Sequence, residues 1–156
     1  MGKLKFVLDV DGVMNTGQFL YSSEGKVFKI FGPHDRDGLK LIADKMDITF
    51  ITADKNGLAI TKKRIVDDMG FKLDVVPEEK RDAYFSKNFD MANLIYMGDG
   101  YHDAKILKQC RFGIAPASAR REAREAADFV TESKAGEGAV LDACLKILEV
   151  FFPERK

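Results

Sequence analysis

Six polar side chains lie near the ends of short apolar runs, and their types could together transfer a phosphoryl group. They are Asp9, Asp11, Thr52, Lys80, Asp99 and Asp103. A carboxylate can attack phosphorus if a hard cation such as Mg²⁺ neutralises the phosphoryl oxygens, and Mg²⁺ prefers carboxylate, carbonyl and water oxygens. A second carboxyl group can protonate the leaving oxygen and later deprotonate the attacking water. These residue types therefore predict phosphoryl transfer, provided that the fold brings them together.

Each of these residues has an expected role in that chemistry. Asp9, Asp99 and the backbone carbonyl of Asp11 could supply oxygen ligands to Mg²⁺. The carboxyl group of Asp11 could act as general acid and base. Thr52 and Lys80 could hold the phosphoryl oxygens and offset charge in the transition state.

Alternation of strand and helix patterns along the chain predicts how these residues meet. Short apolar runs predict strands at 5–10, 48–54, 72–76, 92–100, 112–116 and 128–133. Helical spacing predicts helices at 37–46, 57–70, 78–89, 102–110, 118–127 and 138–152. Two partly alternating segments predict a β-hairpin over 17–32. The pattern predicts a single α/β domain, 1–156, whose mainly parallel sheet gathers the six residues at the carboxyl ends of its strands.

Composition narrows the class of protein. Lysine plus arginine and aspartate plus glutamate each number 25, so the formal net charge of zero gives no sign of a nucleic-acid or anionic-membrane partner. No apolar run approaches a membrane span, and the N-terminus shows no signal-peptide pattern, so we expect a cytoplasmic protein. Cys110 and Cys144 lie in helix-like stretches, which favours buried thiols.

Four motifs in order resemble those of haloacid-dehalogenase (HAD) superfamily phosphatases. They are "DVDGVMNTG" (9–17), Thr52 of "FITAD", Lys80 of "EEKRDA" and "MGDGYHD" (97–103). The flanks, including "YSSEGKVFKIF" and "DFVTESKAGEGAVLDACLKIL", resemble small phosphatases of phosphorylated 3-deoxy-ulosonic and nonulosonic acids. Substrates of that family include 3-deoxy-D-manno-octulosonate (KDO) 8-phosphate and sialic-acid-type 9-phosphates. The resemblance implies a Rossmann-like, HAD-like three-layer sandwich with a protruding β-hairpin.

The same resemblance implies a role for each motif residue. Asp9 would be the nucleophile and Asp11 the general acid and base, while Thr52 and Lys80 would bind phosphate. The implied Mg²⁺ ligands are Asp9, Asp11 and Asp99. Asp103 would orient a water on the metal or Lys80.

Motif spacing bears on how substrate reaches the site. Asp9 and Thr52 are 43 positions apart, and Thr52 and Lys80 are 28 apart, which leaves no room for the cap domain of larger relatives. Capless relatives form tetramers in which the hairpin of one subunit helps cover the site of the next. The resemblance therefore implies a homotetramer assembled through the 17–32 hairpin, whose aromatic residues favour a subunit interface.

Two segments depart from the family pattern and bear on the substrate. Relatives often read "TDG" or "SDG" where this chain has Asn15-Thr16-Gly17, and "TGR" where it has Thr52-Ala53-Asp54. The missing arginine could have bound an anionic part of the substrate, whereas Asp54 would repel such an anionic group.

The same residues allow other interpretations. A calcium loop starting at Asp9 would need Asp or Asn at position 13 and Glu at position 20, where the chain has Val13 and Leu20. A phosphorylated receiver domain would carry its phospho-acceptor residue at the end of a middle strand, where this chain has Thr52, so the sequence does not favour that class. A third alternative is a catalytically weak oligomerisation module, like the phosphatase-like domain of some CMP-sialic acid synthetases (acylneuraminate cytidylyltransferases).

Two roles remain open for His34 and Arg36, and two for the 134–138 segment. His34 and Arg36 could contact substrate at the mouth of the site or have a plain loop role. The 134–138 segment could be a mobile lid or a turn before the last helix.

Overall fold

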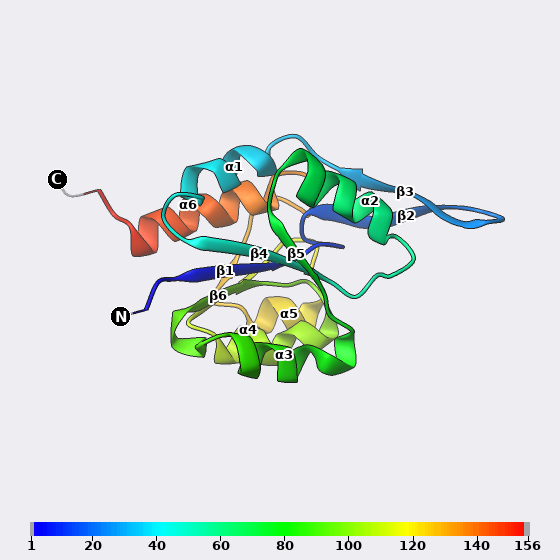
Figure 1. The fold of residues 1–156 in the computed structure, drawn as a ribbon. Helices are drawn as coiled ribbons and strands as arrows, with labels where there is room; N and C mark the ends of the chain where they lie inside the picture. Colours follow the sequence, from blue (N-terminus) through cyan, green and yellow to red (C-terminus); the bar gives the residue numbers. More distant parts are fainter. Residues whose placement is uncertain (1, 155–156) are drawn as a thin grey trace.

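A six-stranded parallel sheet lies between two layers of helices in the computed structural model, which describes residues 2–154 (Figure 1). Its strands are β1 (Lys5–Asp9), β4 (Asp47–Thr52), β5 (Lys72–Val75), β6 (Leu94–Met97), β7 (Phe112–Ala115) and β8 (Phe129–Val130). They lie in the order β5-β4-β1-β6-β7-β8, and every neighbouring pair is parallel. The predicted three-layer α/β architecture is confirmed.

The helices cover both faces of the sheet, so the central strand is buried on both sides. One face carries α1 (Asp35–Ile42), α2 (Leu58–Lys62) and α6 (Ala139–Phe151), and the other carries α3 (Arg81–Asn88), α4 (Ala104–Gln109) and α5 (Arg121–Ala126). Because side chains alternate along a strand, Phe6 and Leu8 pack in the core cluster with α1 and α6, while Val7 packs in the cluster with α3 and α4.

Short helical segments of other types connect these elements. They are η1 (Lys63–Asp68, a π-helix that continues α2) and the 3₁₀ turns η2 (Glu78–Lys80), η3 (Met91–Asn93) and η4 (Tyr101–Asp103). The predicted helix at 57–70 is thus α2 plus η1, closed by Gly70 at a φ of +75°. The predicted strand at 128–133 is shorter than expected, because only Phe129 and Val130 pair with β7.

A separate antiparallel hairpin, β2 (Asn15–Ser22) and β3 (Gly25–Phe31), projects beyond the end of the sheet (Figure 1). Gly25 turns the chain at a φ of +117°, a conformation that favours glycine. Between Asp9 and Thr52 the chain holds this hairpin, α1 and their connections. Within residues 2–154 there is therefore no inserted cap domain, as the motif spacing predicts.

The 134–138 segment is a turn packed against the base of the hairpin. A Cβ atom on Gly32 would lie 1.9 Å from the carbonyl oxygen of Gly136, and one on Gly136 would lie 2.8 Å from Thr16. After this turn, Asp35 caps α6 by accepting backbone N–H bonds from Val140 at 3.0 Å and Leu141 at 3.3 Å. The structure favours the turn over the lid. Across the described chain, no helix has the length and apolar character needed to cross a membrane.

Candidate active site

A cavity of about 440 Å³ opens where β1, β4 and β6 end, between the sheet and the hairpin. In parallel sheets ligands bind at this edge, because the loops that leave the strands surround it. Its lining residues come from four loops and from the hairpin: Asp9, Asp11, Gly17, Phe19, Lys26, Ala53, Asp54, Glu78, Arg81, Asp99, Gly100, Tyr101, His102 and Asp103. The structure thus brings together four of the six predicted residues, namely Asp9, Asp11, Asp99 and Asp103.

Asp9 is the last residue of β1 and lies at the floor of the cavity, only 8% exposed. Its Oδ1 atom accepts hydrogen bonds from the Val10 backbone N–H at 3.0 Å and from Arg81 Nη2 at 3.1 Å. Burial raises the pKa of Asp9 well above its usual value; Arg81 opposes this, and the nearby carboxylates reinforce it. Neither of these two hydrogen bonds uses the other carboxylate oxygen of Asp9, Oδ2.

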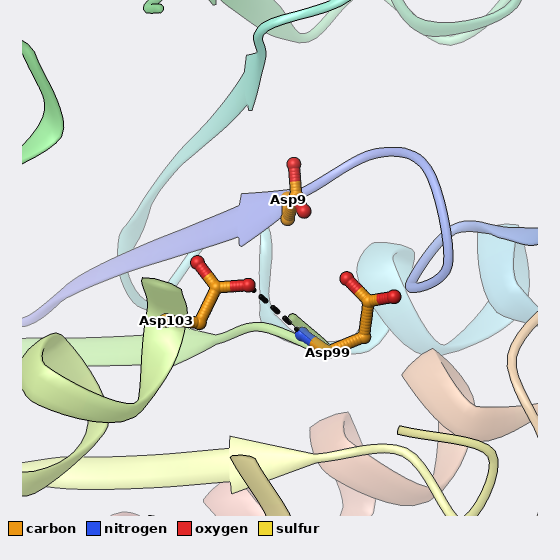
Figure 2. Close-up of side chains that lie close together, drawn as sticks. All are labelled: Asp9, Asp99 and Asp103. Carbon is orange, nitrogen blue, oxygen red and sulfur yellow. Dashed lines mark hydrogen bonds between the residues drawn. The ribbon is translucent and has the colours of Figure 1, made fainter. Parts of the chain in front are cut away.

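Asp9, Asp99 and Asp103 form one acidic group, with a ligand atom from each lying within 4.8 Å of the other two (Figure 2). Burial and repulsion by Asp103 raise the pKa of Asp99 to about 6. The loop after β1 approaches Asp99 so closely that a Cβ atom on Gly12, whose φ is +82°, would lie 2.0 Å from Asp99 Oδ2. Glycine is therefore required at position 12 for Asp99 to reach Asp9.

Asp103 organises this group, and all its lone pairs are already used. Its Oδ2 atom accepts the backbone N–H groups of Asp99 at 3.1 Å and Gly100 at 2.9 Å (Figure 2 shows the first). Its Oδ1 atom accepts from Tyr96 at 2.6 Å and from Arg81 Nη1 at 2.7 Å. A carboxylate offers about four acceptor sites, so Asp103 is better suited to orient its neighbours than to bind a cation directly.

Arg81, not Lys80, is the cation that the structure brings to the acids. Lys80 is exposed and does not line the cavity, whereas Arg81 is 6% exposed and bridges Asp9 and Asp103. The reason is helical phase: Arg81 and Phe85 are four positions apart and share the buried face of α3, while Lys80, in the preceding η2 turn, is exposed. The sequence pattern could have indicated Arg81, because it is four positions before Phe85 and so lies on the same face of the predicted helix, whereas Lys80 does not. The phosphate-binding role of Lys80 stays a prediction, and Arg81 is an additional basic residue beside the acids.

Asp11 lies on the cavity wall, and its carboxylate is outside the acidic group. Asn15 Nδ2 donates to its Oδ1 at 2.8 Å, and Lys29 Nζ lies 2.8 Å from the same oxygen. Asn15 also accepts the backbone N–H groups of Gly12 at 3.0 Å and Gly17 at 2.9 Å, so it organises the loop in which the chain departs from the family. As a metal ligand, Asp11 can therefore contribute its backbone carbonyl rather than its carboxylate, which is held elsewhere.

Thr52 ends β4 one position beyond the register partner of Asp9, and it is 1% exposed. Its Oγ1 accepts the backbone N–H of Asp54 at 3.1 Å, which leaves its own proton free to be donated. The cavity is lined by the next two residues, Ala53 and Asp54, and not by Thr52 itself.

Asp54 does not present an unpaired charge to the cavity. Its Oδ2 lies 2.6 Å from Lys26 Nζ and 2.9 Å from Lys29 Nζ, both on the hairpin. Although burial raises the pKa of Asp54, hydrogen bonds from these two lysines outweigh it and hold the pKa at about 2. The repulsion expected from the sequence is thus offset within the chain. His34 and Arg36 are exposed and outside the cavity lining, which favours their loop role.

The acidic group suits a divalent cation. Asp9 and Asp99 offer carboxylate oxygens close together, and Arg81 pairs with Asp9 and Asp103 of the group. Burial raises the pKa of both acids, neighbouring carboxylates raise it further, and Arg81 opposes the rise. Hard oxygen donors with excess negative charge are the set that Mg²⁺ and similar ions prefer.

Comparison with known proteins agrees with this fold. Residues 82–143 match the family model described as haloacid dehalogenase-like hydrolase. A parallel sheet with helices on both faces and acidic residues at its strand ends is consistent with that class. The KDO 8-phosphate phosphatase of Haemophilus influenzae is 31% identical over 152 residues, covering 94% of this chain and 83% of that protein. The chain therefore belongs to the KDO 8-phosphate phosphatase family within that class.

Solved structures are similar over the same extent. A HAD superfamily subfamily III A hydrolase from Legionella pneumophila has a TM-score of 0.80 at 28% identity and covers 94% of this chain and 83% of its own. The KDO 8-phosphate phosphatase of Moraxella catarrhalis, solved with magnesium, phosphate and KDO, has a TM-score of 0.79 at 26% identity. That match covers 93% of this chain and 85% of the Moraxella chain.

Proposed function

We propose that this protein is a Mg²⁺-dependent phosphomonoester hydrolase that acts on a phosphorylated keto-sugar acid through an aspartyl-phosphate on Asp9. The observation that carries the proposal is the position of Asp9 in the cavity, where one of its carboxylate oxygens lies within 4.8 Å of a carboxylate oxygen of Asp99 and Asp11 lines the same cavity. Nucleophile, cation ligands and general acid are thereby within reach of one phosphoryl group.

The reaction has two halves. In the first, the Oδ2 atom of Asp9 bonds to phosphorus and the ester P–O bond breaks. The electron pair of that bond stays on the leaving oxygen, which takes a proton from Asp11. In the second, Asp11 accepts a proton from water as the water oxygen bonds to phosphorus, and the P–O bond to Asp9 breaks to release phosphate. Asp9 and Asp11 end the cycle in their starting states.

The remaining site residues position and stabilise. Arg81 holds the second oxygen of Asp9, and its buried Nε–H has no partner within the described chain, so this guanidinium retains donor capacity. Asp103 fixes Arg81 and the backbone before Asp99. Thr52 keeps a hydroxyl proton for donation. A bound Mg²⁺, held by Asp9, Asp99 and the Asp11 carbonyl, would neutralise the phosphoryl oxygens.

The substrate class rests on the relatives and on the outer part of the cavity. One relative is named a KDO 8-phosphate phosphatase, and another is described in complex with KDO. The volume of about 440 Å³ is within the range of small-molecule sites. Lys26 and Asp54 give the outer wall both donors and acceptors for hydroxyl groups. Eight-carbon KDO 8-phosphate and nine-carbon sialic-acid-type 9-phosphates both fit this description.

Assembly into a homotetramer through the hairpin is part of the proposal. The hairpin exposes large apolar side chains, including Leu20 at 53%, Tyr21 at 67% and Phe28 at 61%. A short hairpin is marginally stable by itself, and contiguous exposed apolar side chains mark association surfaces.

Phosphate release from a panel of phosphorylated sugar acids, with Mg²⁺ and then with a chelator, tests the proposal. We expect turnover that requires the cation and that Asp9→Asn lowers by at least about 10³-fold, because the nucleophile is lost. Asp44→Asn, an exposed change of the same kind, is the matched control. Unchanged turnover in Asp9→Asn would contradict the mechanism. A tetramer that hydrolyses none of these esters would favour the oligomerisation module instead.

A further inference from the structure

Lys29 is a buried cation on the hairpin for which the proposed reaction has no role so far. Its side chain is 0% exposed, although β3 belongs to the sheet that projects from the molecule. Its Nζ lies 2.8 Å from Asp11 Oδ1, 2.9 Å from Asp54 Oδ2 and 2.8 Å from Thr61 Oγ1. An ammonium group has three N–H donors, so all three are directed at oxygen atoms of the protein.

Asp11 is consequently held from two sides. Asn15, on the same loop, donates to Oδ1 at 2.8 Å. Lys29, from the hairpin, lies 2.8 Å from Oδ1 and donates to Oδ2 at 3.1 Å. Contacts to both oxygens from two different elements prevent the carboxyl group from rotating, while its side chain stays 19% exposed on the cavity wall.

Anchoring the hairpin does not by itself account for Lys29. Lys26 of the same hairpin already pairs with Asp54 at 2.6 Å and lies 3.6 Å from the centre of the Phe19 ring. Burying a second ammonium group is costly unless its partners compensate, and an apolar side chain would usually fill such a position as well. Lys29 adds contacts with Thr61 and Asp11, and of these two Asp11 is the residue that takes part in the proposed reaction.

We propose that Lys29 is a positioning residue, which holds the carboxyl group of Asp11 where it can pass its proton to the leaving oxygen. The inference rests on the proposed function, since it assumes that Asp11 is the general acid. The hairpin lines the cavity and, through Lys29, also positions the general acid of its own subunit. A proton transfer depends on donor and acceptor being within hydrogen-bond reach, so loss of this support lowers the rate without removing the acid.

Leaving-group dependence separates this role from a merely structural one. A sugar-acid phosphate leaves as an alkoxide that needs the proton of Asp11, whereas p-nitrophenyl phosphate leaves as a stable phenolate that does not. We expect Lys29→Met to lower kcat/KM about 10²-fold for KDO 8-phosphate and less than about tenfold for p-nitrophenyl phosphate. Lys62→Met, the same change at an exposed lysine of α2, should alter neither value.

A double variant tests whether Lys29 acts through Asp11. Asp11→Asn should show the same leaving-group pattern more strongly, and adding Lys29→Met to it should cause little further loss on KDO 8-phosphate. Equal losses of Lys29→Met on both esters, or additive losses in the double variant, would overturn the inference. A wild-type protein inactive on both esters would instead overturn the proposed function.

Folding of the variant is measured separately by its thermal unfolding. Lys29→Met leaves Asp54 paired with Lys26 and Asp11 bonded to Asn15, so we expect the fold to persist. If it does not, Lys29→Gln retains a side-chain donor in the same place and is assayed with both esters. The inference then requires the larger loss on KDO 8-phosphate, and equal losses overturn it.

Discussion

Arg81 Nη2 lies 3.1 Å from Asp9 Oδ1 and joins the start of α3 to the end of β1. The contact occupies the Oδ1 atom of Asp9 and does not involve its Oδ2 atom. It also provides the positive charge nearest to the proposed nucleophile, where negative charge develops during phosphoryl transfer.

Replacing Arg81 by methionine should therefore lower kcat/KM for a phosphorylated sugar acid by about 10²- to 10³-fold, because a charged donor is lost beside the reacting atoms. Lys80→Met, the same type of change one position earlier, should cause a smaller loss, because Lys80 is exposed and outside the cavity. Steady-state phosphate release measures both. A larger loss in Lys80→Met than in Arg81→Met would contradict the placement of the cation.

Gly12→Ala should impair the site through Asp99. The new Cβ atom would need space now occupied by Asp99 Oδ2, and the φ of +82° adds strain of about 1–3 kcal/mol. We expect lower stability in urea denaturation and a higher Mg²⁺ concentration for half-maximal activity. Gly70→Ala, with a φ of +75° and open space around it, should show the strain without the change in Mg²⁺ dependence. The same Mg²⁺ dependence in both variants would count against steric displacement of Asp99.

Asp35 should make stability depend on pH. Its side chain is fully buried, Oδ2 has no partner within the described chain, and burial raises its pKa above the usual value. The native state therefore binds more protons than the unfolded state above the unfolded pKa of about 3.9, so this group lowers the free energy of unfolding as pH rises through its native pKa.

Asp35→Asn keeps an acceptor for the N-terminus of α6 and removes the ionisation. Its free energy of unfolding relative to wild type should therefore increase between pH 4 and pH 7 in urea titrations. Asp35→Ala removes the cap as well and should cost about 1–2 kcal/mol. A difference between Asp35→Asn and wild type that is constant with pH would contradict this origin of the pH dependence.

Charged substitutions on the hairpin should dissociate the proposed tetramer. Phe28→Glu and Tyr21→Glu place a carboxylate on side chains that are 61% and 67% exposed, so the isolated subunit tolerates them while an apolar interface does not. Sedimentation velocity should show a shift to smaller species. Leu145→Glu, at a 49% exposed position of α6, is the control. A sedimentation coefficient unchanged in both hairpin variants would argue against this surface.

Much of this fold follows from local pattern. The apolar run before Asp9 predicts β1, and parallel strands place Asp9 and Asp99 at one edge. Arg81 could also have been identified, since it continues the helical stripe of Phe85. The contact between Lys29 and Asp11 could not, because it depends on how the hairpin tilts against the loop after β1. Likewise, the sequence suggests that Asp54 would repel an anionic substrate, because its ion pairs with Lys26 and Lys29 depend on the position of the hairpin.

The close contact of Gly32 with Gly136 has a consequence for how the protein is made. Residues from the first quarter of the chain and from near its end lie backbone against backbone at the base of the hairpin. A ribosome releases its product from the N-terminus onward, so β2 and β3 emerge long before the turn that packs beneath them. The base of the hairpin therefore lacks this support until the chain has been made as far as the 134–138 turn, after all the strands of the sheet.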